Sequence, residues 1–301
     1  MTYVQNIGTR PTTDMVSALT ELTTSYSQID VDLQPEDRAL WCYLKPQGRP
    51  SFTKDLLSDL HRVQDLIVTL ATRRERGADV GLLRWVVLAS RTPGLFNLGG
   101  DLTVFSHLIR SGDKEGLRRY AYSCVKVAYL NSTGYEGDAI TIGLAQGDAL
   151  GGGFESLLSC DLLVAERRAR FALPEVMFGL FPGMGAHPFL SRRVGPAMAQ
   201  RMILSGEMYT AEAMHAKGVV DVLVEDGTGE LAVREYILKN GPRSNGHAAS
   251  YKARRRLYPV TLNDLRDVAD IWVDTAMCLT EQELRRMSHL VAAQDRARRA
   301  A

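Results

Sequence analysis

The sequence predicts an α/β fold whose strands pair largely in parallel, and two observations support this. Short apolar runs of strand length recur at 38–44, 84–90, 139–147, 161–165 and 219–224. Longer segments of helical character lie between most of these runs. Strands that alternate with helices are typical of βαβ units, in which a helix connects two parallel strands.

The first elements follow a polar N-terminal arm. Residues 1–30 are rich in Thr and Ser, which indicates a loosely held segment. The strand at 38–44 ends at a stretch of prolines and a glycine, and Thr53 is placed to cap the next helix. Basic residues at 73–77 suit the C-terminal end of that helix. Its apolar residues recur at helical spacing: Leu56, Leu57, Leu60, Val63, Ile67 and Leu70.

The central elements begin with the continuous apolar run at 84–90, which predicts a strand buried on both faces. The elements that follow are a glycine-containing loop at 93–101, mostly helical residues at 102–130, a strand at 139–147, a helix at 152–159, a short strand at 161–165, a helix from Thr210 to Gly218 and a strand at 219–224. The alternation continues to about residue 224.

Beyond residue 228 the sequence becomes charged and helix-prone. Apolar residues between 261 and 300 have the spacing of helices that pack one face against a partner surface. We therefore divide the chain into an N-terminal arm at 1–30, a core at 31–228 and a C-terminal helical region at 229–301.

Composition excludes several classes of protein. The chain of 301 residues is 45% hydrophobic with a formal net charge of +1, so we expect a sizeable core and no binding to nucleic acid or a membrane surface. No apolar run approaches the ~20 residues of a transmembrane helix, and the N-terminus lacks a secretory signal pattern. The four cysteines are far apart, which favours buried thiols over disulfides or zinc. We expect a cytoplasmic protein.

Two glycine-rich loops, at 98–101 and 151–153, each follow a predicted strand. Glycine lets a backbone N–H group approach a ligand closely, and two convergent N–H groups stabilise the oxyanion formed from a thioester carbonyl. Taken alone, each loop is better interpreted as a tight turn between a strand and a helix. The spacing at 147–153 does not match the dinucleotide-binding pattern Gly-x-Gly-x-x-Gly.

Two glutamates are candidates for acid/base chemistry. Glu155 follows the triple glycine in the first helical turn, where it either acts in catalysis or complements the helix dipole. Glu175 follows Pro174 within an apolar stretch, so it lies either at an exposed turn or in a pocket that raises its pKa. We favour a functional role for Glu175.

Other polar residues are assigned structural roles. Asp101 is placed to cap the next helix, and we expect Asp161 to make a structural contact. His107 and His187 have no Cys or Asp partner at a telling spacing, and no serine lies in a Gly-x-Ser-x-Gly turn. The sequence therefore does not support a Ser-His or Cys-His hydrolase.

The spaced set of motifs at 96–101, 149–155, 173–175 and 182–185 resembles the crotonase (enoyl-CoA hydratase/isomerase) superfamily. The similarity covers about residues 35–225. It implies a right-handed spiral of ββα units with a helical C-terminal region, which would serve in oligomerisation and as a lid on the pocket. It also implies a homotrimer or a hexamer, an acyl-CoA or acyl-ACP thioester substrate, and no cofactor or metal.

The resemblance also implies roles for single residues. The N–H groups of Leu98 and Gly152 would form the oxyanion hole, and Glu155 and Glu175 would be the catalytic pair. Because many relatives with other activities lack one or both glutamates, their joint presence favours the addition or removal of water across a C2–C3 bond. The implied substrate-binding residues are Gly99, Gly151, Leu173, Phe178 and Met184.

A closer resemblance extends into the C-terminal helices. FNLGGDL, QGDALGGGFESLLSCD, LPEVMFGLFPGMGA and the stretch at 271–277 together are similar to the diffusible-signal-factor synthases of bacterial quorum sensing. This similarity implies dehydration of a 3-hydroxyacyl chain on acyl carrier protein to a cis-2-enoyl chain, followed by thioester hydrolysis. It also implies the acyl carrier protein and the receiver domain of a sensor kinase as partners.

Two alternatives remain open. One is a general enoyl-CoA hydratase of fatty-acid oxidation, and the other is a regulatory binding protein that keeps the fold without turnover. Basic clusters at 252–256 and 296–299 offer a docking site for an acidic carrier protein or a nucleotide phosphate. A solvated basic face is the simpler interpretation of both clusters.

Overall fold

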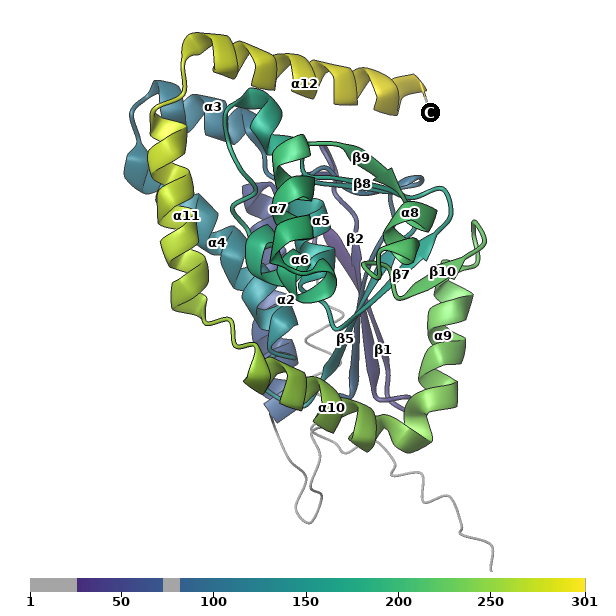
Figure 1. Cartoon of the computed structure of the whole chain (residues 1–301). Coiled ribbons are helices and arrows are strands. Elements are labelled where there is room, and N and C mark those ends of the chain that lie inside the picture. Colours follow the sequence, from purple (N-terminus) through teal and green to yellow (C-terminus); the bar gives the residue numbers. More distant parts are fainter. Residues whose placement is uncertain (1–25, 73–81, 301) are drawn as a thin grey trace, which may run out of the picture.

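The computed structural model describes residues 26–72 and 82–300, and it confirms the α/β prediction (Figure 1). The larger sheet has the strand order β1-β2-β3-β5-β7-β10, and the smaller sheet has the order β4-β6-β8-β9. The strands are β1 (Ile29–Gln34), β2 (Ala39–Leu44), β3 (Trp85–Ser90), β4 (Leu95–Asn97), β5 (Ile140–Ala145), β6 (Asp148–Leu150), β7 (Leu162–Glu166), β8 (Arg170–Ala172), β9 (Met208–Thr210) and β10 (Val222–Val224).

The helices lie on both faces of the larger sheet and continue into the C-terminal region (Figure 1). They are α2 (Lys54–Thr72), α3 (Leu102–Arg110), α4 (Lys114–Ser132), α5 (Gly152–Leu158), α6 (Ala186–Val194), α7 (Pro196–Ser205), α8 (Ala211–Ala216), α9 (Gly229–Asn240), α10 (Ser244–Leu257), α11 (Leu262–Met277) and α12 (Glu281–Ala300), with 3-10 turns η1 (Pro174–Phe178) and η2 (Gly241–Arg243). Within the described ranges, no helix is both long and apolar enough to cross a membrane.

The two sheets repeat one pattern along the chain. Each of β3, β5 and β7 is followed by a three-residue strand of the smaller sheet. From β2 to β10 all neighbours in the larger sheet are parallel, whereas β1 pairs antiparallel with β2. In the smaller sheet Leu95 pairs with Asp148 and Asn97 with Ala149. This register brings the loop after β4 beside the loop after β6.

The central strands β2, β3, β5 and β7 of the larger sheet are buried on both faces, as the apolar run at 84–90 predicted for β3. Because side chains alternate along a strand, successive residues of β2 enter different cores. Trp41 belongs to the cluster that α9 and α10 cover, whereas Cys42 belongs to the main core with α2 and α4. All six residues of β3 are buried.

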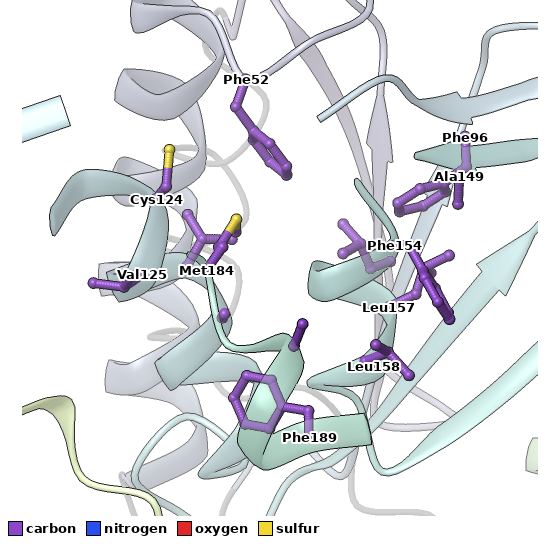
Figure 2. Close-up of a cluster of buried hydrophobic side chains, with 14 of the residues drawn as sticks. Phe52, Phe96, Cys124, Val125, Ala149, Phe154, Leu157, Leu158, Met184 and Phe189 are labelled. Atoms are coloured by element: carbon purple, nitrogen blue, oxygen red, sulfur yellow. The ribbon is translucent and has the colours of Figure 1, made fainter. Parts of the chain in front are cut away.

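Helix α5 lies inside the main core, and all seven of its residues are buried. Figure 2 shows its residues Phe154, Leu157 and Leu158, with Phe96 and Ala149 of the smaller sheet close to Phe154. The Phe154 ring also packs against Phe171, with 5.1 Å between ring centroids. A helix that is enclosed on every side holds its first turn in one position.

The structure differs from the sequence-based elements at several points. The predicted arm includes Ile29 and Asp30, yet these residues begin β1, which pairs with β2. Residues 1–25 and the basic stretch 73–77 lie outside the described residues. The strand predicted at 139–147 ends at Ala145, and β10 starts only at Val222. The smaller sheet was not predicted, because its three-residue strands are too short to show an alternating pattern.

Candidate active site

The two glycine loops meet in space, as the resemblance implied. A Cβ at position 99 would lie 2.8 Å from the Gly152 nitrogen and 2.8 Å from the Leu150 oxygen, which is closer than any side chain permits. Gly99 also has a φ of +89°, which glycine adopts without strain. Gly99 is therefore needed for the close approach of the two loops.

Two backbone N–H groups remain free where these loops meet. Gly152 is the first residue of α5, so its N–H has no acceptor inside the helix. In the described part of the chain, neither the Gly100 N–H nor the Gly152 N–H has a hydrogen-bond partner. Both glycines line the same cavity, and a Cβ on Gly152 would lie 3.6 Å from the Gly100 nitrogen. Two free backbone N–H groups that lie close together in one cavity are what an oxyanion hole requires.

The expectation for Leu98 needs correction. Its N–H donates to the Pro50 carbonyl oxygen at 2.8 Å, so it is already paired. Leu98 lines the cavity through its side chain instead. The free N–H on this loop belongs to Gly100, two residues further along. Tyr120 fixes this part of the loop, because its hydroxyl accepts from the Asp101 N–H at 3.0 Å and donates to the Phe52 carbonyl oxygen.

Glu155 is buried and held in one orientation. Its Oε1 accepts hydrogen bonds from the N–H groups of Met184 at 2.8 Å and Ala186 at 2.9 Å. Ala186 is the first residue of α6, so the positive end of that helix faces the carboxylate. Burial raises the pKa of Glu155 to about 7, and these N–H groups oppose the rise because they favour the ionised form.

Glu175 lies on η1 and has a different environment. Its Oε2 is buried and has no hydrogen-bond partner among the described residues. Its Oε1 lies against Gly151, where a Cβ would be 2.4 Å away. Burial first, and then the negative charge of Glu155, raise the pKa of Glu175 to about 8. The two carboxyl groups therefore favour a state in which they hold one proton between them near neutral pH.

Both glutamates and both free N–H groups line one cavity with an empty volume of about 680 Å³. Apart from the glutamates, its wall is predominantly apolar: Phe52, Leu98, Gly100, Leu102, Phe105, Tyr120, Ala121, Cys124, Gly151, Gly152, Pro174, Phe178, Leu180, Gly183, Met184, Trp272 and Leu290. Figure 2 shows Phe52, Cys124 and Met184 of this wall. A cavity of this size and polarity suits an acyl chain whose reactive end lies at the carboxyl pair.

The implied substrate-binding residues fall into two groups. Gly151, Phe178 and Met184 line the cavity. Leu173 is only 2% exposed and belongs to the hydrophobic core, and Gly99 acts through loop packing, so neither forms part of the cavity wall.

The C-terminal helices complete the cavity. Trp272 of α11 and Leu290 of α12 line it, and the Trp272 ring packs on Phe105 with 4.9 Å between centroids. The stretch at 271–277 was noted in the sequence for its similarity, but nothing in its pattern placed Trp272 in the site. The Arg118 side chain donates to Asp270 at 2.8 Å and thereby ties α11 to α4.

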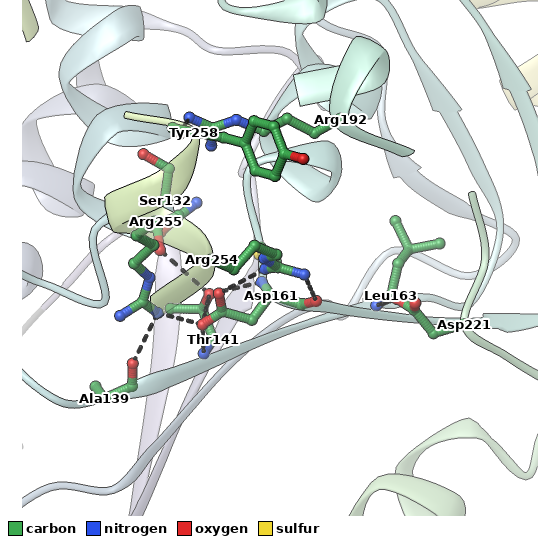
Figure 3. A network of polar contacts seen from close by, with 12 residues as sticks. Ser132, Ala139, Thr141, Asp161, Leu163, Arg192, Asp221, Arg254, Arg255 and Tyr258 are labelled. Atoms are coloured by element: carbon green, nitrogen blue, oxygen red, sulfur yellow. Dashed lines mark hydrogen bonds and ion pairs between the residues drawn. The ribbon is translucent and has the colours of Figure 1, made fainter. Parts of the chain in front are cut away.

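Two structural predictions for acidic residues are confirmed. The Asp101 carboxylate accepts from the Thr103 and Val104 N–H groups and so caps α3. Asp161 is buried and bonds the Thr141 N–H and two arginines of α10, Arg254 and Arg255 (Figure 3). Neither aspartate lines the cavity.

The basic cluster at 252–256 is largely used within the chain. Lys252 pairs with Asp138 at 3.0 Å, and Arg254 and Arg255 pair with Asp161. Lys252, Arg254 and Arg256 nevertheless remain exposed, as a solvated basic face predicts, whereas the Arg255 side chain is only 15% exposed. The side chains of the second cluster, at 296–299, lie outside the described residues.

Comparison with known proteins identifies the family. The sequence model described as enoyl-CoA hydratase/isomerase matches residues 63–243, more than half of the chain. The chain belongs to the enoyl-CoA hydratase/isomerase family. This confirms the resemblance seen in the spaced motifs, and it places α11 and α12 outside the matched region.

Two curated relatives illustrate the similarity. The 2,3-dehydroadipyl-CoA hydratase of Escherichia coli (strain K12) is 45% identical over 94 residues, which cover 31% of this chain and 37% of that protein. "Probable enoyl-CoA hydratase 2, mitochondrial" of Arabidopsis thaliana is 33% identical over 207 residues, which cover 66% of this chain and 61% of that protein. The chain thus matches less than two thirds of the length of these relatives.

Solved structures confirm the crotonase-type fold. An enoyl-CoA hydratase from Bacillus halodurans superposes with a TM-score of 0.71 at 21% identity, covering 87% of this chain and 100% of that one. Pseudomonas aeruginosa DspI superposes with a TM-score of 0.55 at 22% identity, covering 82% of this chain and 87% of that one. At such identities the likeness concerns the fold alone.

Proposed function

We propose that this protein catalyses the removal or addition of water across the C2–C3 bond of an acyl thioester. One observation carries the proposal: two carboxyl groups with raised pKa values line the same apolar cavity as two unpaired N–H groups. Acid/base chemistry beside a carbonyl needs both parts, a pair of groups that exchange one proton and a site for the developing oxyanion.

In dehydration, the thioester carbonyl oxygen accepts hydrogen bonds from the N–H groups of Gly100 and Gly152. One glutamate removes the C2 proton, and the electron pair of that C–H bond moves into an enolate held by these N–H groups. The other glutamate then protonates the 3-hydroxyl group, the C3–O bond breaks and water leaves. Hydration is the reverse sequence with the proton on the opposite glutamate.

The environments of the two groups suggest their roles. Glu155 is fixed by two N–H bonds that favour its ionised form, which suits a group that orients water or the 3-hydroxyl. Glu175 has an unpartnered oxygen and the higher pKa, which suits proton exchange with C2. In the hydration direction Glu175 starts protonated and Glu155 ionised.

For the physiological reaction, we propose dehydration of a 3-hydroxyacyl chain on acyl carrier protein to a cis-2-enoyl chain, with thioester hydrolysis that releases the unsaturated fatty acid as a quorum-sensing signal. The support comes from α11. The sequence similarity to the signal synthases includes 271–277, outside the region that the family model matches, and Trp272 from this stretch lines the cavity. The similarity therefore includes a part of the chain that lines the proposed acyl site.

A second candidate is an enoyl-CoA hydratase of fatty-acid oxidation, because the names of both curated relatives specify CoA thioesters. The two candidates are separated by rates measured side by side on one 3-hydroxyacyl chain loaded on carrier protein and on CoA. Preference for the carrier protein, with free 2-enoic acid detected by mass spectrometry, supports signal synthesis. Preference for CoA, with reversible hydration and no free acid, supports the hydratase.

The regulatory alternative predicts no turnover of any acyl thioester. The E155Q and E175Q variants provide its control, since each retains the shape of the cavity. If wild type and both variants show the same background rate on both carriers, the enzymatic proposal fails. Binding to a receiver domain would then be the function to examine.

A further inference from the structure

A second hollow, polar rather than apolar, lies at the far end of α5 from the active site. Its empty volume is about 400 Å³. The first turn of α5 lines the acyl cavity through Gly152 and Glu155, whereas its last residue, Leu158, lines this hollow. The lining residues are Ser132, Leu158, Ser159, Cys160, Asp161, Phe189, Arg192, Arg193, Arg254 and Arg255.

The four arginines come from two helices, α6 and α10, and they outnumber the carboxylates that pair with them. Asp161 alone receives both α10 arginines, with Arg254 at 2.9 Å. Arg193 pairs with Asp221, also at 2.9 Å. Four guanidinium groups therefore share two carboxylates, which leaves an excess of two positive charges.

Arg192 is the residue left without an acid. It donates to the Tyr258 carbonyl oxygen, and no carboxylate among the described residues pairs with it. Burial and the positive charge of Arg254 lower the pKa of Arg192, so the two guanidinium groups influence each other. Figure 3 shows Arg192 and Tyr258 on one side of Arg254 and Asp161 on the other.

Unused hydrogen-bond donors accompany the excess charge. The Arg255 Nε is buried and has no partner within the described residues, and its side chain is 15% exposed. The Arg254 side chain, at 44% exposed, remains accessible from solvent. Guanidinium groups offer planar pairs of N–H donors that match the oxygens of phosphate. A dianion would balance the charge and accept from the guanidinium N–H groups at the surface of the hollow, foremost those of Arg254, whereas the Arg255 Nε is too deeply buried for a ligand to reach.

We propose that this hollow binds a phosphate-class oxyanion between Arg192 of α6 and the Arg254–Arg255 pair of α10. The bound anion would join the core to the segment that leads through Tyr258 into α11. Its source is either free inorganic phosphate or the phosphoryl group of a larger molecule, because both present the same oxygens.

Calorimetric titration of the full chain with inorganic phosphate tests the site, with ionic strength held constant by sodium chloride. We expect saturable binding of one phosphate, and a roughly tenfold loss of affinity in R192Q, because one charge-assisted hydrogen bond is lost. R256Q is the matched control, since it removes an exposed arginine of α10 that does not line the hollow. Absence of saturable binding, or equal affinities of wild type and R192Q, overturns the proposal.

Two further measurements sharpen the result. The first compares adenosine 3′,5′-bisphosphate with inorganic phosphate. If the bisphosphate binds more tightly, and this gain in affinity is lost in R192Q, the natural ligand is a phosphoryl group of a larger molecule. If it binds equally or more weakly, the natural ligand is the free anion. If R192Q does not fold, R192K replaces it. Lysine keeps the charge without the planar donor pair, so we expect phosphate affinity to fall severalfold. If R192K binds phosphate as tightly as the wild type, the guanidinium group of Arg192 does not contact the anion.

Discussion

Glu175 is packed directly against Gly151. A Cβ at position 151 would lie 2.4 Å from Glu175 Oε1, and Gly151 itself has a φ of +50°. Gly151, which precedes the free N–H of Gly152, therefore also makes room for a carboxylate of the pair. This contact connects the two parts of the proposed site, and it explains why a glycine is needed here beyond the demands of a turn.

Gly151→Ala should reduce both activity and stability. The added methyl group displaces Glu175 and forces an unfavourable backbone conformation, which costs about 1–3 kcal/mol. We expect at least a tenfold fall in dehydration rate and a lower melting temperature. Gly246→Ala on α10 is the control, because its Cβ would meet no atom within 4 Å. An active, wild-type-like G151A would refute the role assigned to this contact.

Replacing either glutamate should stop the chemistry without unfolding the protein. General acid/base groups typically contribute about 10²–10⁴-fold, so E155Q and E175Q should each lose that much dehydration activity. Initial rates on a 3-hydroxyacyl thioester measure the effect, and circular dichroism checks the fold. Because the two groups exchange one proton, the double variant should be little slower than either single variant. A double variant that forms the 2-enoyl product at the wild-type rate would rule out this mechanism.

The raised pKa values predict how stability depends on pH. A buried glutamate with a raised pKa binds its proton more tightly in the folded state than in the unfolded state. It therefore destabilises the fold progressively as pH rises from about 4.5 through about 8, the pKa of Glu175. E175Q should match wild type near pH 4 and have a higher melting temperature at pH 9. A difference in melting temperature that is constant over this range would show that Glu175 titrates normally.

Activity should follow the same protonation states. The pair must hold one proton, so the rate should fall tenfold per unit at pH values above the range of about 7 to 8 set by the two glutamates. The logarithm of kcat/KM plotted against pH measures this. In E175Q, Glu155 remains as the proton donor to the 3-hydroxyl, so the residual dehydration rate should keep a high-pH limb that begins near the pKa of Glu155, about 7. A limb that still begins near pH 8 in E175Q would assign it to another group.

Trp272 should control which acyl chains fit. Its ring packs on Phe105 and covers Gly183, where a Cβ would lie 2.7 Å from the indole. Trp272→Phe keeps an aromatic ring but enlarges the cavity, so we expect the ratio of rates to shift toward longer chains. Ile271→Ala is the control, because Ile271 is the neighbouring residue on α11 and is 60% exposed. If W272F has the same preference for acyl-chain length as the wild type, Trp272 does not determine that preference.

Much of the fold can be predicted from the sequence, because the patterns that indicate its longer helices and strands lie within short stretches of the chain. Helix α2 shows six apolar residues at helical spacing, and each of β2, β3 and β5 is a run of apolar residues long enough to recognise. Strands such as β4 and β8 carry no such signal. Three residues become a strand only when a neighbour is present to accept and donate their hydrogen bonds.

The site divides in the same way. The sequence by itself determined the family motifs, both glutamates and the glycines at 151 and 152. Only the tertiary structure decided that the free N–H beside Gly152 belongs to Gly100 rather than Leu98, because the Leu98 N–H donates to the carbonyl oxygen of Pro50, a residue 48 positions away. Likewise, the raised pKa values of Glu155 and Glu175 depend on burial and on each other. Hydrogen-bond partners and burial come from distant segments, which a local pattern of residues does not encode.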